Sequence, residues 1–209
     1  MQINKYRLPN QLFMLLETLA KLDRAFLRPY LTRHAPRQAI ALYSRGRAPF
    51  LTQLSHEQPA PYEPPASLAR TLGGITFRSN ILNAAGMFKK GEGYDLVHAQ
   101  GAGGYLAGTT TSWPRTGNTI DGIMWPFTPY SCSGSASNCL GLPNPGHFDV
   151  AYRLGTIPRK SGCPIGASIA LDPLDPDHPE PIETRIEHLL DGITAYTEHA
   201  IDFLELNES

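Results

Sequence analysis

Four short segments, each ending in small or polar residues, constrain the fold of this chain more than any other feature. Each has the length and composition of a buried strand. Helical patterns separate them, which predicts an α/β fold with parallel strands and right-handed crossovers. The segments are residues 81–86, 105–110, 164–170 and 202–207. Residues that carry chemistry are therefore expected at the C-terminal ends of these strands, where the following loops begin.

The order of elements leaves two architectures open. Residues 91–99, 147–154 and 182–196 are predicted helices, and residues 68–78 are a predicted hairpin ahead of the first strand. Four βα units suit either half of a (β/α)8 barrel or a small open doubly wound sheet. Residues 111–146 are rich in Gly, Pro, Ser and Asn and too long for a plain connection, so we expect them to be functional.

The first 47 residues differ from the rest in charge and pattern. They hold nine Lys/Arg against two acidic residues, a net charge of +7 in a chain whose total is −1. Residues 10–31 are predicted to form an amphipathic helix, and a short second helix is expected from Pro36 through Tyr43. Residues 48–67 are a predicted Pro-rich linker. The apolar stripe of the first helix consists of Leu12, Leu15, Leu16, Leu19, Leu22, Phe26, Leu27 and Tyr30.

This basic, amphipathic segment predicts peripheral docking on an anionic membrane surface. The alternative is that the apolar stripe packs on the protein's own surface. The rest of the chain carries a net charge of −8, which argues against a nucleic-acid partner. Localisation is therefore expected to be cytoplasmic or peripheral on the cytoplasmic face of a membrane.

Composition excludes several other classes of protein. Three cysteines without CxxC spacing argue against a disulfide framework or a zinc site, and favour a reducing compartment. The histidines show no metal-binding spacing, so no metal is expected and most are predicted surface groups. No apolar run approaches 18 residues, and no signal-peptide pattern opens the chain.

Four constellations could carry chemistry. Residues 83–89 place three tiny residues at a strand end and then Lys89, which would let a flat ring approach the backbone near a cation. A tight turn with a solvated lysine is the plainer interpretation. The threonines of residues 108–111 offer hydroxyls, although threonine is also a common strand residue. Asn138 and Asn144 bracket a Gly/Pro turn and suit an imide or amide edge. Asn207 follows a buried strand and needs a partner.

Taken in order, these segments resemble the dihydroorotate dehydrogenases, particularly the membrane-associated, quinone-using class, over residues 70–209. The motifs that carry the resemblance are Asn83–Glu92, Gly108–Thr111 with Pro114 and Gly117-Asn118, Asn138–Gly146, and Leu206–Ser209. The resemblance implies a (β/α)8 TIM barrel and an FMN flavoprotein, an oxidoreductase that converts dihydroorotate to orotate in de novo pyrimidine biosynthesis. A quinone is one electron acceptor that fits the resemblance, and the identity of the acceptor is left open.

The resemblance also implies roles for individual residues. The expected FMN contacts are Ala85, Gly86, Lys89, Thr109, Ser168 and Asn207. The expected contacts of dihydroorotate or orotate are Lys89, Asn138, Cys139, Leu140, Gly141, Leu142 and Asn207. Three residues depart from the family pattern: Phe88 replaces an Asp of the quinone-using class, Ser168 replaces an FMN-contacting Asn, and Leu140 replaces a Met.

The resemblance further implies that residues 68–209 are the N-terminal half of the barrel. The catalytic base is expected just after Ser209, and the chain alone is expected to be inactive. Two alternatives stay open at this point. One is a paralogous FMN barrel acting on another small cyclic substrate, suggested by Phe88 and Ser168. The other is a non-catalytic remnant or interaction module. The oligomeric state is left open.

Overall fold

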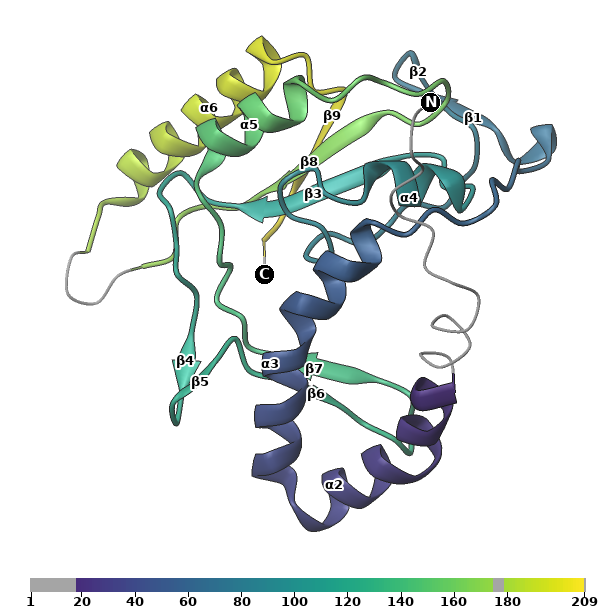
Figure 1. The fold of residues 1–209 in the computed structure, drawn as a ribbon. Coiled ribbons are helices and arrows are strands. Elements are labelled where there is room, and N and C mark those ends of the chain that lie inside the picture. The colour runs from purple at the N-terminus through teal and green to yellow at the C-terminus, as the bar shows by residue number, and fades with distance from the viewer. Residues whose placement is uncertain (1–17, 175–178, 209) are drawn as a thin grey trace, which may run out of the picture. The chain divides into compact units, whose positions relative to one another are not determined.

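The computed structural model describes residues 18–174 and 179–208, and these form two compact units. The helical unit comprises the described residues up to Glu57 together with Gly117–Gly141. The sheet unit comprises Gln58–Thr116 and the described residues from Leu142 onward. Residues 117–141 thus group with the N-terminal segment, although they were expected to be part of the barrel half. The course of the chain through both units is coloured by residue number in Figure 1.

The helical unit begins with a helix that covers residues 18–22 and continues through a π-helical turn, η1 (Asp23–Leu27), into α2 (Arg28–His34). Ala35 leaves the helical conformation, as is common before a proline, and α3 (Pro36–Ser55) follows. The helix predicted to end at Tyr43 therefore extends to Ser55, and residues 48–55 of the predicted linker are helical. Leu12, Leu15 and Leu16 of the predicted stripe lie outside the described residues.

Polar contacts tie the helical unit together. The Asp23 carboxylate accepts hydrogen bonds from Arg28 at 2.6 Å and from the Tyr43 hydroxyl at 2.5 Å, which links η1 and α2 to α3. The Ser44 hydroxyl is 4% exposed and accepts the Phe127 N–H at 2.9 Å. This bond fixes residues 117–141, which are inserted between two parts of the sheet unit and are called the inserted residues below, to α3.

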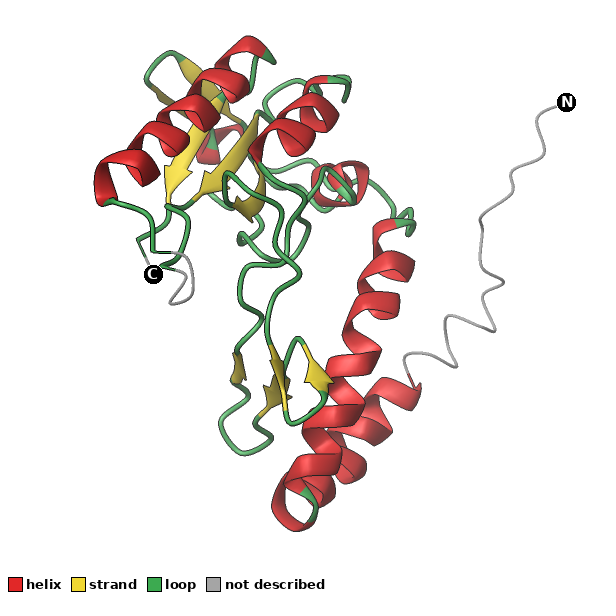
Figure 2. Cartoon of the chain, turned by 90° about the vertical axis from the view of Figure 1, so that its left-hand side faces the viewer, coloured by secondary structure: helices red, strands yellow, loops and turns green. Residues whose placement is uncertain are grey.

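The inserted residues form two antiparallel hairpins where irregular loop was expected. The first pairs β4 (Thr119–Ile120) with β5 (Ile123–Met124), and the second pairs β6 (Phe127–Pro129) with β7 (Ala136–Asn138). Figure 2 shows these short strands beside α3.

The sheet unit follows the predicted order of elements closely. The hairpin expected within residues 68–78 is confirmed, and its two central glycines have the left-handed backbone that such a turn requires. The strand segments 105–110, 164–170 and 202–207 and all three predicted helices are also confirmed, within a few residues at their ends. In chain order the elements are η2 (Ala66–Leu68), β1 (Arg70–Leu72), β2 (Ile75–Phe77), α4 (Tyr94–Ala99), β3 (Tyr105–Thr110), α5 (His147–Gly155), β8 (Ile165–Ile169), α6 (Ile182–Glu198) and β9 (Phe203–Leu206).

The three longer strands form one parallel sheet in the order β3-β8-β9. Tyr105 pairs with Ile165, and Gly166 pairs with Phe203, so the C-terminal ends of all three strands meet at one edge. Helices α5 and α6 run side by side (Figure 1) and contact each other, and α6 also contacts β8. Val150, Ala151 and Leu154 of α5 and Ala195 and Tyr196 of α6 are buried, whereas Ile182, Ile186 and Leu190 of α6 are exposed. The largest fully buried side chains of this core are Tyr105, Tyr196, Phe88, Leu96, Leu154, Ile165, Ile169 and Val150.

The first of the four expected strands does not form. Residues 81–86 contribute a single parallel bridge, between Leu82 and Gly104. The Asn83 side chain then takes the place of backbone pairing, because its Nδ2 donates to the Leu106 carbonyl at 2.8 Å and its Oδ1 accepts the Leu106 N–H at 3.0 Å. The segment still runs beside β3, but the side chain of Asn83 supplies the two hydrogen bonds that a strand's backbone would make.

Candidate functional site

Three strand ends bring together three of the residues predicted to contact a cofactor. Thr109 at the end of β3 and Ser168 in β8 place their hydroxyl oxygens 2.9 Å apart. Asn207, just after β9, donates from Nδ2 to the Thr109 hydroxyl at 2.9 Å. Its own N–H bonds the Ile169 carbonyl at 2.8 Å, which extends the parallel pairing by one residue. The result is a polar row, Asn207–Thr109–Ser168, built from segments far apart in sequence.

Gly108 permits the close approach of the backbone at this edge. Its φ is +97°, and an added Cβ would lie 2.4 Å from the Ser168 carbonyl oxygen. The Gly108 carbonyl also accepts the Gly86 N–H at 2.6 Å, which holds residues 84–86 against the end of β3. An added Cβ at Gly86 would meet no atom within 4 Å in the described chain, so open space lies over this turn.

Lys89 extends from the same turn toward a second loop. Its ammonium donates to the Pro143 carbonyl at 3.0 Å. The Glu92 carboxylate accepts the backbone N–H groups of Lys89 at 3.2 Å and Lys90 at 2.6 Å, which closes the turn around them. The lysine is therefore presented by a fixed backbone rather than by a loose loop.

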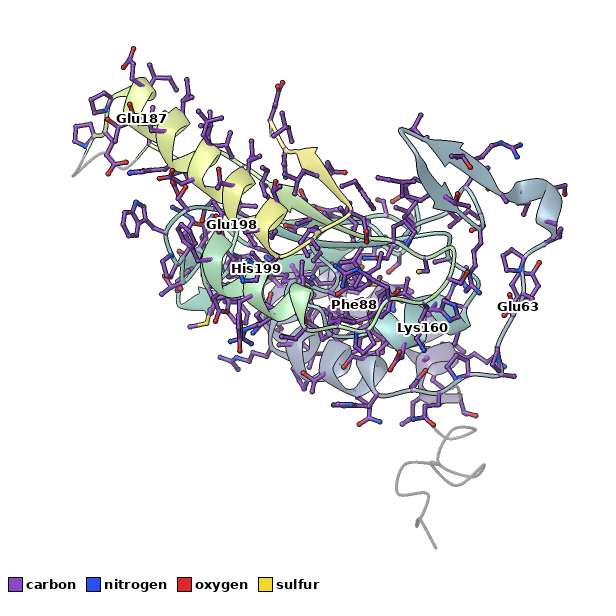
Figure 3. All side chains as sticks on the ribbon, turned by 90° about the horizontal axis from the view of Figure 1, so that it is seen from above. Glu63, Phe88, Lys160, Glu187, Glu198 and His199 are labelled. Carbon is purple, nitrogen blue, oxygen red and sulfur yellow. The ribbon has the colours of Figure 1, made fainter. Side chains whose placement is uncertain are left out.

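Phe88, which departs from the family pattern, is an interior residue. It is 1% exposed, and its ring packs so closely on Gly93 that a Cβ there would lie 2.7 Å from it. Figure 3 labels Phe88 in the crowded interior of the sheet unit. Its side chain fills core volume, so its effect on a ligand is confined to support of the turn that carries Lys89.

The residues expected to contact substrate divide between the two units. Asn138, Cys139, Leu140 and Gly141 belong to the helical unit, whereas Leu142 belongs to the sheet unit with the polar row and Lys89. Asn138 is exposed and pairs with Phe127 at the end of the second hairpin. The Cys139 sulfur accepts a hydrogen bond from Asn118 at 3.2 Å. Asn144, whose amide was predicted to suit an imide, uses that amide within the protein instead.

Sequence reasoning missed a buried network behind the polar row. The Thr110 hydroxyl lies 2.8 Å from His147 Nδ1 and 2.8 Å from the Tyr196 hydroxyl. Most of the histidines were expected at the surface, but His147 is fully buried. Burial lowers the pKa of His147 to about 4, against the opposing influence of Asp172, so the imidazole is neutral. Its position on the apolar face of α5, three, four and seven residues before Val150, Ala151 and Leu154, was the signal that could have revealed it.

Comparison with known proteins decides the family. The family model described as dihydroorotate dehydrogenase matches residues 67–183, more than half of the chain. The chain belongs to the dihydroorotate dehydrogenase family.

Curated and solved relatives agree with this membership. The chain is 34% identical over 99 residues to "Dihydroorotate dehydrogenase (quinone)" of Shewanella sp. (strain W3-18-1), and equally so to that of Shewanella putrefaciens. Each match covers 47% of this chain and 27% of the relative, so the matched stretch spans about a quarter of the relatives' length. The crystal structure of dihydroorotate dehydrogenase from Eimeria tenella in complex with ferulenol has a TM-score of 0.52 at 18% identity.

The structural likeness covers 74% of this chain and 50% of the Eimeria tenella chain. It assigns the parallel sheet to the α/β-barrel architecture of dihydroorotate dehydrogenases and excludes the open doubly wound alternative. Of the four βα strands expected from the sequence, the described residues contain three as strands and the first as a bridged segment.

Proposed function

We propose that this protein is an FMN-dependent oxidoreductase that oxidises dihydroorotate to orotate in pyrimidine biosynthesis. The observation that carries the proposal is the polar row Asn207–Thr109–Ser168 at the C-terminal edge of the parallel sheet, next to the glycine turn and Lys89. That edge is where barrels of this class carry their chemistry. Membership of the dihydroorotate dehydrogenase family supports the substrate.

The residues at this edge suit a flavin. The space over Gly86 is open, and Ala85 and Gly86 have no bulky side chain to block a flat ring system. The donors that converge there are an amide, two hydroxyls and an ammonium, which match the carbonyl and nitrogen acceptors at the polar end of an isoalloxazine ring. We assign the ring contacts to Ala85, Gly86, Lys89, Thr109, Ser168 and Asn207.

The chain's own groups would then bind and orient both ligands. When bound, FMN supplies the acceptor for the hydride that leaves C6 of dihydroorotate. The Lys89 ammonium compensates negative charge on the substrate carboxylate and on the ring system. The Asn207 amide, which donates a hydrogen bond to the Thr109 hydroxyl, would orient the ligands at the polar row. On the strength of the family's sequence motif, Asn138, Cys139, Leu140, Gly141 and Leu142 are proposed contacts of the substrate.

We expect the full-length gene product to purify yellow with bound FMN, and Lys89→Ala to lower its turnover of dihydroorotate by about tenfold or more. The reason is that a hydrogen bond from a charged group is worth about 1.5–3 kcal/mol, and a factor of ten in rate corresponds to about 1.4 kcal/mol. Flavin absorbance and steady-state kinetics provide the measurement.

Lys90→Ala is the matched control, because Lys90 is exposed and lies in the same turn, where the Glu92 carboxylate accepts its backbone N–H. It should leave turnover near the wild-type value. A folded but colourless full-length protein would refute the flavin assignment. A yellow protein that oxidises another small cyclic compound but not dihydroorotate would favour the paralogous barrel.

We also propose that a quinone accepts the electrons and that the N-terminal segment docks on an anionic membrane. The curated relatives are named for quinone. Side chains of the predicted stripe are exposed, with Leu19 at 51%, Phe26 at 71% and Tyr30 at 63%. Among the described residues no helix is long and apolar enough to cross a bilayer.

Phe26→Gln should lower binding of the protein to anionic phospholipid vesicles by about tenfold, because burying a phenylalanine side chain contributes about 1.5–3 kcal/mol. Vesicle co-sedimentation measures this. Phe148→Gln is the matched control, since Phe148 on α5 is 62% exposed but lies outside the N-terminal segment. Equal sedimentation of the wild-type protein, Phe26→Gln and Phe148→Gln would contradict the membrane proposal. Raising the salt concentration should weaken any electrostatic contribution to vesicle binding.

A further inference from the structure

Asn144 is a buried amide whose hydrogen-bonding capacity is fully used. It is 8% exposed. Its Oδ1 accepts the Gly146 N–H at 2.8 Å and the Thr111 N–H at 3.3 Å. Its Nδ2 donates to the Leu142 carbonyl at 2.8 Å and to the Thr111 hydroxyl at 2.9 Å. An amide offers two donors and two acceptor sites, so nothing remains for a ligand.

These four bonds join the end of β3 to the loop that enters α5. Thr111 directly follows β3 and lies two residues beyond Thr109 of the polar row. The backbone of Asn144 is paired as well, because its N–H bonds the Arg115 carbonyl at 3.0 Å and its carbonyl accepts the Arg115 N–H at 2.8 Å. Residue 144 is thus fixed by both its side chain and its main chain.

The neighbour of this fixed residue supplies a hydrogen-bond acceptor for Lys89. Pro143 lies between Leu142 and Asn144, and its carbonyl accepts a hydrogen bond from the Lys89 ammonium at 3.0 Å. A shift of residues 142–144 would therefore move two things together, namely Leu142, a proposed substrate contact, and this acceptor of Lys89. The hydrogen bonds among Thr109, Ser168 and Asn207 do not involve Asn144 and would persist.

We propose that Asn144 is a positioning residue for substrate: it fixes Leu142 and Pro143 relative to the end of β3, and through Pro143 it sets the place of the Lys89 ammonium. This role rests on the proposed function and deepens it. It predicts that damage at Asn144 weakens substrate binding while the flavin is retained.

The test uses Asn144→Asp in the full-length gene product. The change keeps both acceptor interactions but places an oxygen, in place of N–H, against the Leu142 carbonyl. We expect amide hydrogen exchange of residues 142–147 to become about tenfold faster, consistent with loss of a buried hydrogen bond. The KM for dihydroorotate should rise by a similar factor, with FMN content unchanged and kcat changed less.

Asn83→Asp is the matched control for exchange. Asn83 also donates an amide hydrogen to a backbone carbonyl and accepts a backbone N–H, both of Leu106. Its substitution should speed exchange near residues 81–86 and 106 but not in residues 142–147. Thr111→Val is the milder second variant, because it removes one of the four hydrogen bonds of the Asn144 amide, together with the bond from the Thr111 hydroxyl to the Trp113 carbonyl. It should raise the KM two- to threefold.

The outcomes separate the two proposals. Unchanged exchange of residues 142–147 in Asn144→Asp would overturn the positioning role, as would faster exchange with an unchanged KM. If Asn144→Asp does not fold, an unchanged KM in Thr111→Val overturns it. A full-length protein without flavin would refute the proposed function, and so the substrate role that rests on it, while the exchange data would still show whether Asn144 fixes the loop.

Discussion

Replacing Gly108 with alanine should lower the free energy of unfolding of the sheet unit by about 3 kcal/mol or more, through steric overlap and backbone strain together. The added Cβ would lie 2.4 Å from the Ser168 carbonyl oxygen, which is a backbone atom of β8 and cannot rotate away. Relief requires separation of β3 from β8, whose pairing is one of the two that hold the three-stranded sheet together. Urea titration followed by hydrogen exchange of β8 amides measures the change.

Gly74→Ala distinguishes the two causes. Gly74 lies in the same sheet unit and also has a positive φ, +81°, but an added Cβ there would meet no atom within 4 Å. Its substitution should cost only the conformational part, about 1 kcal/mol. If the free energy of unfolding falls by the same amount in both variants, contact with Ser168 is not the reason for glycine at position 108.

Stability of the sheet unit should fall by about 2 kcal/mol between pH 7 and pH 5 because of His147. Burial lowers the pKa of its imidazole from 6.5 to about 4, so the unfolded chain takes up a proton in this window while the folded chain does not. The stabilisation is therefore complete above about pH 6.5 and declines as pH falls toward 4. Denaturant midpoints of the sheet unit across this range give the slope.

His147→Gln is the control for the pH effect, because glutamine offers hydrogen-bonding groups to Thr110 but does not titrate. The variant should lose most of the slope between pH 7 and pH 5. A smaller slope should remain from His98, whose pKa is also lowered, chiefly by burial. An unchanged slope in His147→Gln would show that another group accounts for the pH dependence.

Strands β3 and β8 could be predicted because they are buried on both faces. Every residue of β3 and β8 is buried, and such strands have short, nearly continuous runs of apolar and small residues. Residues 81–86 resemble a strand in the same way, yet Ile81 is 66% exposed and Asn83 bonds the neighbouring backbone with its side chain. Composition does not distinguish a segment that bonds its neighbour through a side chain from a strand that pairs through its backbone.

Helix α3 shows where local preference is overridden. Pro49 suggested an early end, since proline disfavours a helix interior, but the helix runs on to Ser55. Ahead of Pro49, Ser44 accepts the N–H of Phe127, a residue 83 positions away. No window of sequence around Pro49 contains that partner.

The candidate site was predictable in part for a geometric reason. Thr109, Ser168 and Asn207 could be placed near one another because parallel strands present their C-terminal ends at one edge. Asn144 and His147 were misjudged, because an amide or imidazole in a polar loop gives no sign of whether it serves a ligand or the protein. Their partners, Thr110, Thr111 and Tyr196, become evident only after folding.

The antiparallel bridge between Arg115 and Asn144 closes the base of residues 117–141. The chain leaves the sheet unit and re-enters it at a paired position, so the ends of this stretch are held together by the sheet unit itself. Lengthening a segment between fixed ends costs little, because closure entropy grows only with the logarithm of length. We therefore expect the polar row to keep its geometry when residues are added to the turn between β6 and β7, with the proposed substrate contacts Asn138–Gly141 left unchanged.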